Sequence, residues 1–115
     1  MNILFLCTVN VQRSKTAEEL FRVLYPENAY KSAGLSAKYV TKAGSTLCTE
    51  GLLNWADKIY VFEQAHIERI EQYTKNRYVH KVTNLDIPDE YCYFQKELVL
   101  MLICIFSPAL ITQLH

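Results

Sequence analysis

Two side chains capable of covalent phosphate chemistry, Cys7 and Arg13, lie near the start of the chain with five residues between them, and Ser14 follows directly. A cysteine thiolate is a nucleophile. An arginine guanidinium is a planar group that can bind two phosphate oxygens at once, which a lysine cannot do. The chemistry that such a pair could perform is attack of sulfur on the phosphorus atom of a bound phosphate.

The elements expected on either side would place these groups at a strand-to-helix turn. Residues 3–6 read ILFL, which is typical of a short buried strand, and residues 15–24 are expected to form a helix. The N–H groups of such a turn face inward, and the positive end of the helix dipole lies behind them. This field also favours the thiolate form of Cys7. We therefore predict a phosphate-binding loop of Thr8, Val9, Asn10, Val11, Gln12, Arg13 and Ser14.

A simpler interpretation is that Cys7 is an ordinary buried cysteine at a strand end, because free cysteines are usually buried. The context favours the nucleophile. Asn10 tolerates the left-handed backbone that an inward-folded loop requires, and Ser14 could donate a hydrogen bond to the thiolate. Strand, loop, helix and these two residues together make a coincidental Cys-x5-Arg pattern a poor explanation.

Residues 3–14, together with Ala17 and Glu18, resemble the phosphate-binding loop of low-molecular-weight protein tyrosine phosphatases. Residues 32–34 resemble the end of that family's second strand, and residues 56–63 its third strand. Residues 87–91, IPDEY, resemble its late loop, which supplies an acid. The resemblance spans about residues 2–106. It implies a cysteine-dependent phosphatase that needs no metal or cofactor.

The resemblance also implies the proton donor. Asp89 matches the acidic position of the late loop, although Glu90 replaces the proline that usually follows it. Asp86 is the rival, but an aspartate ahead of a helix is often only a turn or cap residue. Tyr91 shares the loop and is the predicted substrate-binding aromatic. His66 and His80 are expected to be surface or helix residues, since the chemistry needs no histidine.

Other departures from the family concern redox protection and the substrate cleft. Gln12 stands where many members have a second loop cysteine, and Val9 stands where glycine is common. The stretch between residues 34 and 53 is expected to be shorter than in the family by about thirty residues, on the scale at which loops vary. Substrate choice therefore cannot be carried over from the family.

The alternation of strands and helices predicts an α/β fold: one three-layer domain, residues 1–115, with a four-stranded parallel sheet. The expected strands are residues 2–6, 29–33, 58–63 and 79–84. Helices are expected at residues 15–24, 64–74 and 95–106, with one or two more in the middle. The loops that carry Cys7 and Asp89 follow the first and fourth strands, so both would emerge at the same edge of the sheet.

Composition limits the partners. The 12 basic residues equal the 12 acidic ones, which gives no support for nucleic-acid or membrane-surface binding. The apolar run 98–106 is too short to span a membrane, and a buried helix ending before Pro108 is expected. Apolar residues surround this helix, so a homodimer that packs through it is also consistent with the sequence. A catalytic thiolate needs a reducing compartment, so we predict a cytoplasmic protein.

Three functions remain. The first is hydrolysis of phosphotyrosine-like phosphate monoesters, of a protein or a small aryl phosphate, through a cysteinyl-phosphate. The second is thiol-dependent arsenate reduction, which needs two more cysteines in a disulfide relay. Cys48 and Cys92 are not closely spaced, and Cys104 is expected to be buried. The third is a phosphate-binding module without turnover.

Overall fold

The structure is a computed structural model that describes residues 1–106 of the chain. Its elements alternate between strand and helix, as predicted. In chain order they are β1 (Asn2–Cys7), α1 (Arg13–Leu24), β2 (Ala29–Gly34), α2 (Ala37–Ala43), α3 (Glu50–Trp55), β3 (Lys58–Val61), α4 (Gln64–Thr74), the 3-10 turn η1 (Val79–Lys81), β4 (Val82–Asn84) and α5 (Lys96–Phe106).

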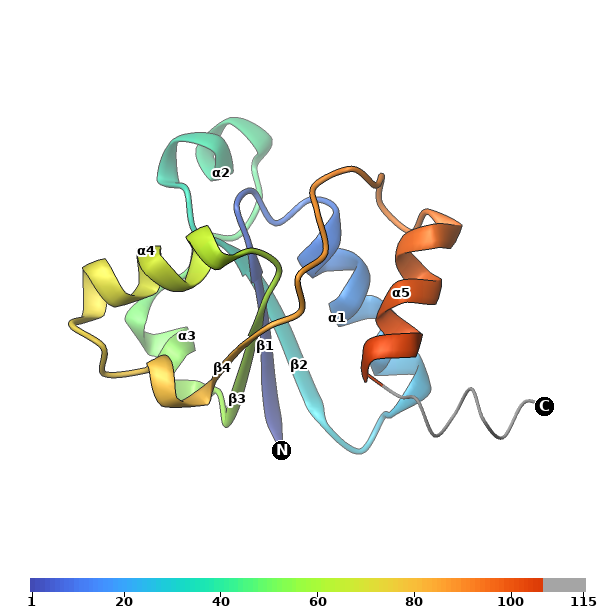
Figure 1. Cartoon of the computed structure of the whole chain (residues 1–115), viewed down its shortest axis with the longest axis horizontal. Helices are drawn as coiled ribbons and strands as arrows, with labels where there is room; N and C mark the ends of the chain where they lie inside the picture. Colours follow the sequence, from blue (N-terminus) through green and yellow to red (C-terminus); the bar gives the residue numbers. More distant parts are fainter. Residues whose placement is uncertain (107–115) are drawn as a thin grey trace.

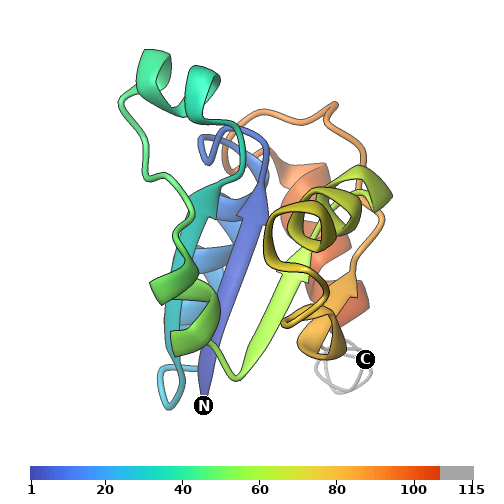
Figure 2. The same ribbon diagram turned by 90° about the vertical axis from the view of Figure 1, so that its left-hand side faces the viewer.

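The four strands form one parallel sheet in the order β2-β1-β3-β4, which confirms the predicted fold class (Figure 1). Side chains of β1 alternate between the two faces, because successive residues of a strand point to opposite sides. Ile3 and Phe5 belong to the core cluster that includes residues of α1 and α5. Leu4 and Leu6 belong to the second cluster, with residues of α3 and α4. The sheet is therefore the middle of three layers (Figure 2).

Two expectations about the late part of the chain are wrong. Residues 79–84 were expected to be one strand, but only Val82–Asn84 pair with β3, and the first three residues form the turn η1. Cys104 was expected to be buried and is exposed. α5 buries Leu98 and Leu102, which are four residues apart and face the core, so Cys104 points away from it.

α5 is described as far as Phe106, so the expected helix end before Pro108 and residues 109–111 lie outside the described residues. Within residues 1–106, no helix is both long enough and apolar enough to cross a membrane.

The arrangement brings two distant segments together at one edge of the sheet. Residues 8–12 leave β1 at its carboxyl end, and residues 85–95 run from β4 past this loop to α5 (Figure 1). The predicted meeting of the two loops is therefore what the fold produces.

Candidate active site

A pocket of about 290 Å³ opens where these two segments meet. Asp89 is its only lining residue from the late segment among the residues that the structure describes. The other lining residues all come from the predicted phosphate loop and its flanks: Cys7, Thr8, Val9, Val11, Gln12 and Arg13. The nucleophile and the acid predicted from the sequence thus share one pocket, although 82 positions separate them in the chain.

The Cys7 sulfur lies at the bottom of the loop and is almost fully buried. The backbone N–H of Asn10 donates a hydrogen bond to it over 3.3 Å. Asn10 has φ of 62°, the left-handed conformation predicted for it from the sequence. This conformation turns the Asn10 amide inward to the sulfur, so the loop backbone is folded around the thiol.

Ser14 also contacts the Cys7 sulfur. Its hydroxyl oxygen lies 2.9 Å from Cys7 Sγ and 2.7 Å from Asn10 Oδ1. The hydroxyl has a single hydrogen to donate. When Cys7 is a thiol, its S–H can donate to Ser14, and Ser14 can donate to Asn10. When Cys7 is a thiolate, the serine hydrogen can turn to the sulfur, which is the role expected of Ser14.

Several loop amides are left without an internal acceptor. No described residue accepts a hydrogen bond from the N–H groups of Val9, Val11 or Gln12. Gln12 also precedes α1, so the first N–H groups of the helix add to this set. Unused amides at a helix N-terminus bind anions. The loop is therefore suited to hold a phosphate above the Cys7 sulfur.

The end of β2 holds the loop from behind. The N–H of Leu35 donates to the Cys7 carbonyl over 2.9 Å, and that of Ser36 donates to the Thr8 carbonyl over 3.0 Å. A Cβ at Gly34 would lie 2.8 Å from the Val9 carbonyl carbon and 2.9 Å from the Thr8 oxygen. Only glycine lets the strand approach the loop this closely. The sequence marked Gly34 through the family resemblance but did not reveal this contact.

Arg13 is almost completely buried, and described groups surround its guanidinium. Its Nη1 donates to the carbonyl of Ile87 over 2.9 Å. Its Nη2 lies 2.9 Å from Glu63 Oε2, and its Nε lies 3.7 Å from Asp89 Oδ1. The guanidinium carbon also stands 5.6 Å from the ring centre of Phe62. Arg13 therefore links the phosphate loop both to α4 and to the segment that carries Asp89.

His66 lies in α4 as expected, but it is buried rather than at the surface. Its Nδ1 accepts hydrogen bonds from the backbone N–H groups of Phe62 and Glu63, each over 3.2 Å. Its Nε2 lies 3.1 Å from the Thr8 hydroxyl. Burial, together with the positive charge of Arg13, lowers the pKa of His66 from 6.5 to about 4. The ring is therefore neutral at pH 7, with its hydrogen on Nε2.

The other predicted residues of the late segment lie away from the pocket. Asp86 is exposed, has φ of 55° and donates its backbone N–H to Asn84 Oδ1, as a turn residue would. Tyr91 is partly buried against the core cluster of α1 and α5 and is not among the residues that line the pocket. Of the two aspartates, only Asp89 is placed beside Cys7.

A slightly larger pocket, of about 330 Å³, lies between α4 and the segment from Leu35 to Leu53. Its lining is mainly apolar and includes no residue of the phosphate loop. Cys48 lines it, and burial raises the pKa of this thiol to about 12, so it stays protonated. Chemistry, rather than size, identifies the smaller pocket as the candidate active site.

Comparisons with known proteins agree with this assignment. Residues 2–52, just under half of the chain, match the model of the low molecular weight phosphotyrosine protein phosphatase family. The matched range contains the whole phosphate loop. The match covers the part of the chain in which the sequence resembles this family's phosphate-binding loop. No curated protein sequence matches the chain.

Solved structures extend the likeness of fold to nearly the whole chain. The tyrosine phosphatase Wzb from Escherichia coli K30, in complex with phosphate, is 23% identical with a TM-score of 0.73, over 99% of this chain and 98% of that one. The YwlE arginine phosphatase from Geobacillus stearothermophilus is 23% identical with a TM-score of 0.69, over 97% and 94%. Wzb from Vibrio vulnificus, in complex with benzylphosphonate, is 24% identical with a TM-score of 0.71, over 96% and 95%.

Proposed function

We propose that this protein is a phosphatase that hydrolyses phosphotyrosine-like phosphate monoesters through a cysteinyl-phosphate intermediate. One observation carries the proposal: Cys7 and Asp89 line the same pocket, whose remaining lining is an anion-binding loop ending in Arg13. Nucleophile, oxyanion-binding groups and proton donor are the three parts that the reaction needs.

The first step transfers the phosphoryl group to the enzyme. The Cys7 thiolate attacks phosphorus, the S–P bond forms and the P–O ester bond breaks. The loop amides and the Arg13 guanidinium stabilise the equatorial oxygens as charge develops on them. The protonated carboxyl of Asp89 gives its proton to the departing oxygen, so that an alcohol or phenol leaves rather than its anion.

The second step returns the enzyme to its starting state. A water molecule attacks phosphorus and gives a proton to the Asp89 carboxylate. The S–P bond then breaks, and inorganic phosphate and the Cys7 thiolate are released. The Ser14 hydroxyl, 2.9 Å from the sulfur, stabilises the thiolate as a leaving group in this step. No metal or cofactor takes part in either step.

Two observations weigh against the alternative functions. For arsenate reduction, a relay cysteine would have to reach Cys7, but no other cysteine lines its pocket: Cys48 lies in the second pocket, and Cys92 and Cys104 are exposed. For a binding module without turnover, the acid would be dispensable, yet Asp89 lines the pocket beside the nucleophile.

The substrate class is part of the proposal. We infer that the substrate is a phosphorylated protein or a small aryl phosphate in the cytoplasm, with no nucleic-acid or membrane partner. Because one of the similar structures is described as an arginine phosphatase, a phosphoarginine peptide belongs in the same assay. A homodimer through α5, where Leu100 and Ile105 are exposed, stays a prediction that measurement of the mass in solution tests.

The decisive test is hydrolysis of para-nitrophenyl phosphate, a phosphotyrosine peptide and a phosphoarginine peptide in buffer that contains a metal chelator. Wild-type protein should turn over the aryl phosphates, and Cys7→Ser should lose roughly 10⁴-fold or more of the rate. Acid quenching during turnover should leave one phosphoryl group on Cys7, detected by peptide mass. Turnover that survives in Cys7→Ser would exclude the mechanism. Phosphate binding without turnover by wild type would favour the binding module.

A further inference from the structure

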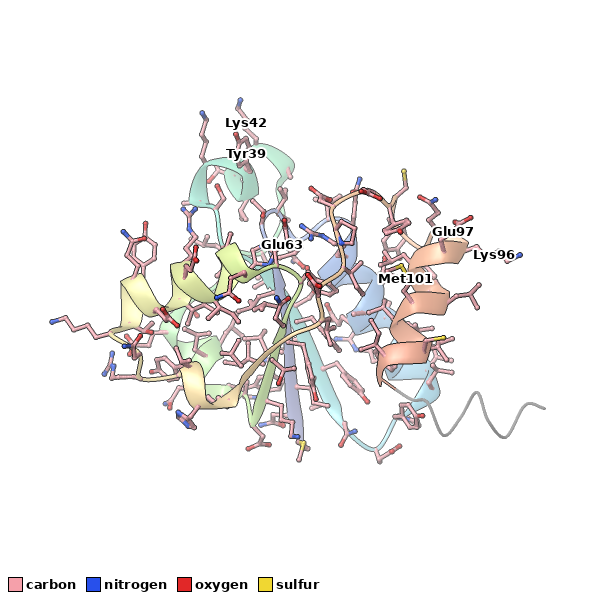
Figure 3. All side chains as sticks on the ribbon, viewed as in Figure 1. Tyr39, Lys42, Glu63, Lys96, Glu97 and Met101 are labelled. Carbon is pink, nitrogen blue, oxygen red and sulfur yellow. The ribbon has the colours of Figure 1, made fainter. Side chains whose placement is uncertain are left out.

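The first turn of α4 and its N-cap residue, Glu63, contact both ends of the phosphate loop. At the start of the loop, His66 Nε2 lies 3.1 Å from the Thr8 hydroxyl. At its end, Glu63 Oε2 lies 2.9 Å from Arg13 Nη2. Figure 3 shows Glu63 at the end of α4 that lies nearest the phosphate loop. Neither Glu63 nor His66 lines the pocket, so neither would touch a bound phosphate directly.

From these contacts we propose that Glu63 and His66 are positioning residues, which hold Arg13 and Thr8 in the geometry that binds the phosphoryl group. This inference rests on the proposed function, because it concerns the same loop. The two residues act through the loop and not on the substrate.

The hydrogen bonds of Arg13 support a holding role for Glu63 rather than a blocking one. A guanidinium has five N–H donors. The Ile87 carbonyl takes one from Nη1, and Glu63 Oε2 forms an ion pair with Nη2 over 2.9 Å. At least three N–H groups remain, and the Nε–Asp89 distance of 3.7 Å is too long for a direct hydrogen bond. Arg13 is therefore fixed on one side and still has donors for phosphate.

The hydrogen bonds of His66 fix its tautomer and hence its role. Both N–H groups that point at Nδ1 are backbone donors, so Nδ1 must accept and the ring hydrogen must be on Nε2. Nε2–H then donates to the Thr8 hydroxyl. Glu63 Oε2 lies 3.5 Å from the same nitrogen, which joins the two contacts into one group. This group ties α4 to the loop.

The expected size of the effect follows from the precision that catalysis needs. A shift of about 1 Å in a group that binds the transition state can cost on the order of 10²-fold in rate. Removal of Glu63 should let the Arg13 side chain rotate. Removal of His66 should free the Thr8 side chain and the adjoining loop backbone. Both changes should weaken binding of phosphate as well as the rate.

Four variants test the proposal. Glu63→Ala removes the acceptor for Arg13, whereas Glu63→Gln retains an acceptor oxygen. His66→Asn retains an acceptor for the Phe62 and Glu63 amides and loses the donor to Thr8. Glu68→Gln is the matched control, because Glu68 is exposed on the same helix.

Three quantities are measured for each variant: kcat and KM for para-nitrophenyl phosphate, the affinity for inorganic phosphate, and amide exchange of residues 8–13 by NMR. Glu63→Ala should lose about 10- to 100-fold in kcat/KM and bind phosphate more weakly, and His66→Asn should lose about 10-fold. Both should exchange loop amides faster. Glu63→Gln should recover most of the loss, and Glu68→Gln should match wild type.

The proposal is overturned if Glu63→Ala and His66→Asn match Glu68→Gln in phosphate affinity and in loop exchange. It is also overturned if Glu63→Gln is as damaged as Glu63→Ala, since the loss would then not depend on an acceptor oxygen that faces Arg13. Failure of the proposed function looks different. Wild type would then show no turnover, while exchange of the loop amides would still respond to both variants.

Discussion

The two sides of the candidate active site are built differently. On the loop side, Cys7, Arg13 and Ser14 are all buried, and described residues hydrogen-bond to each of them. On the other side, the Asp89 side chain is 59% exposed and its segment includes Asp86 with a positive φ. The nucleophile and the anion-binding groups are thus fixed before substrate arrives, whereas the proton donor lies on an exposed segment.

The exposed segment is held at its two ends by groups of α1. At one end the Ile87 carbonyl accepts from Arg13, and at the other the N–H of Phe94 donates to Thr16 Oγ1 over 3.0 Å. Asp89 lies between these attachments. The helix that begins at the phosphate loop therefore also fixes where the acid can reach, and Arg13 belongs to both sides of the site.

The largest effect that this comparison predicts is that of Arg13→Lys. Lysine keeps the charge but loses the planar fork and cannot bond Glu63, Ile87 and phosphate together. We expect kcat/KM for aryl phosphates to fall about 10³-fold, whatever the leaving group, because both sides of the site depend on this residue.

The measurement is kcat/KM across a series of substituted phenyl phosphates, with the affinity for inorganic phosphate alongside. Arg69→Lys, on the exposed face of α4, is the control and should behave as wild type. A loss confined to poor leaving groups would contradict the dual role of Arg13.

A smaller and more selective effect is expected for Asp89→Asn. Asparagine cannot donate a proton in this way, so the rate should fall about 10²-fold for leaving groups of high pKa. Leaving groups of low pKa need no proton and should lose little in the first step. The plot of log kcat/KM against leaving-group pKa should therefore become steeper, while phosphate affinity changes little.

Asp86→Asn is the matched control, because Asp86 is exposed and does not line the pocket. If the steeper slope appears in Asp86→Asn instead, the acid has been assigned to the wrong aspartate. If it appears in neither variant, the exposed side of the site contributes no proton.

The contrast between the two sides also explains what the sequence could predict. The loop is a local motif: residues 7–14 carry the nucleophile, the turn and the arginine within one stretch, and the apolar strand before it marks its place. The parallel sheet followed from alternating strands and helices. The meeting of the Cys7 and Asp89 loops then followed from topology, because carboxyl ends of parallel strands meet at one edge, whereas the choice of Asp89 over Asp86 rested on the family resemblance.

Features that depend on distant partners were not predictable in this way. His66 follows a strand in an ordinary amphipathic helix, and nothing in its local sequence shows that Thr8, 58 positions earlier, is its hydrogen-bond partner. The same holds for Glu63 with Arg13. Apolar residues surround the whole of α5, so the sequence did not indicate which face of the helix is buried. In the structure the face with Leu98 and Leu102 is buried, and Cys104 lies outside it.

The smallest predicted effect concerns the pH dependence of stability on the loop side. His66 has a pKa of about 4 in the folded protein, below its ordinary 6.5, because burial and Arg13 oppose its charge while Glu63 and Asp89 favour it less strongly. The unfolded chain therefore binds more protons than the folded one between these values. The stabilisation is fully present above pH 6.5 and is lost as the pH falls toward 4.

Chemical denaturation of wild type and His66→Asn at pH 7 and pH 5 tests this. Between the two pH values, wild type should lose on the order of 2 kcal/mol more unfolding free energy than His66→Asn, since the other titrating groups are common to both proteins. Equal losses would mean that His66 is not held neutral by its surroundings. An imidazolium carries a hydrogen on both ring nitrogens, so such a result would contradict acceptance of the Phe62 and Glu63 N–H groups by Nδ1, the contacts that orient the ring toward Thr8.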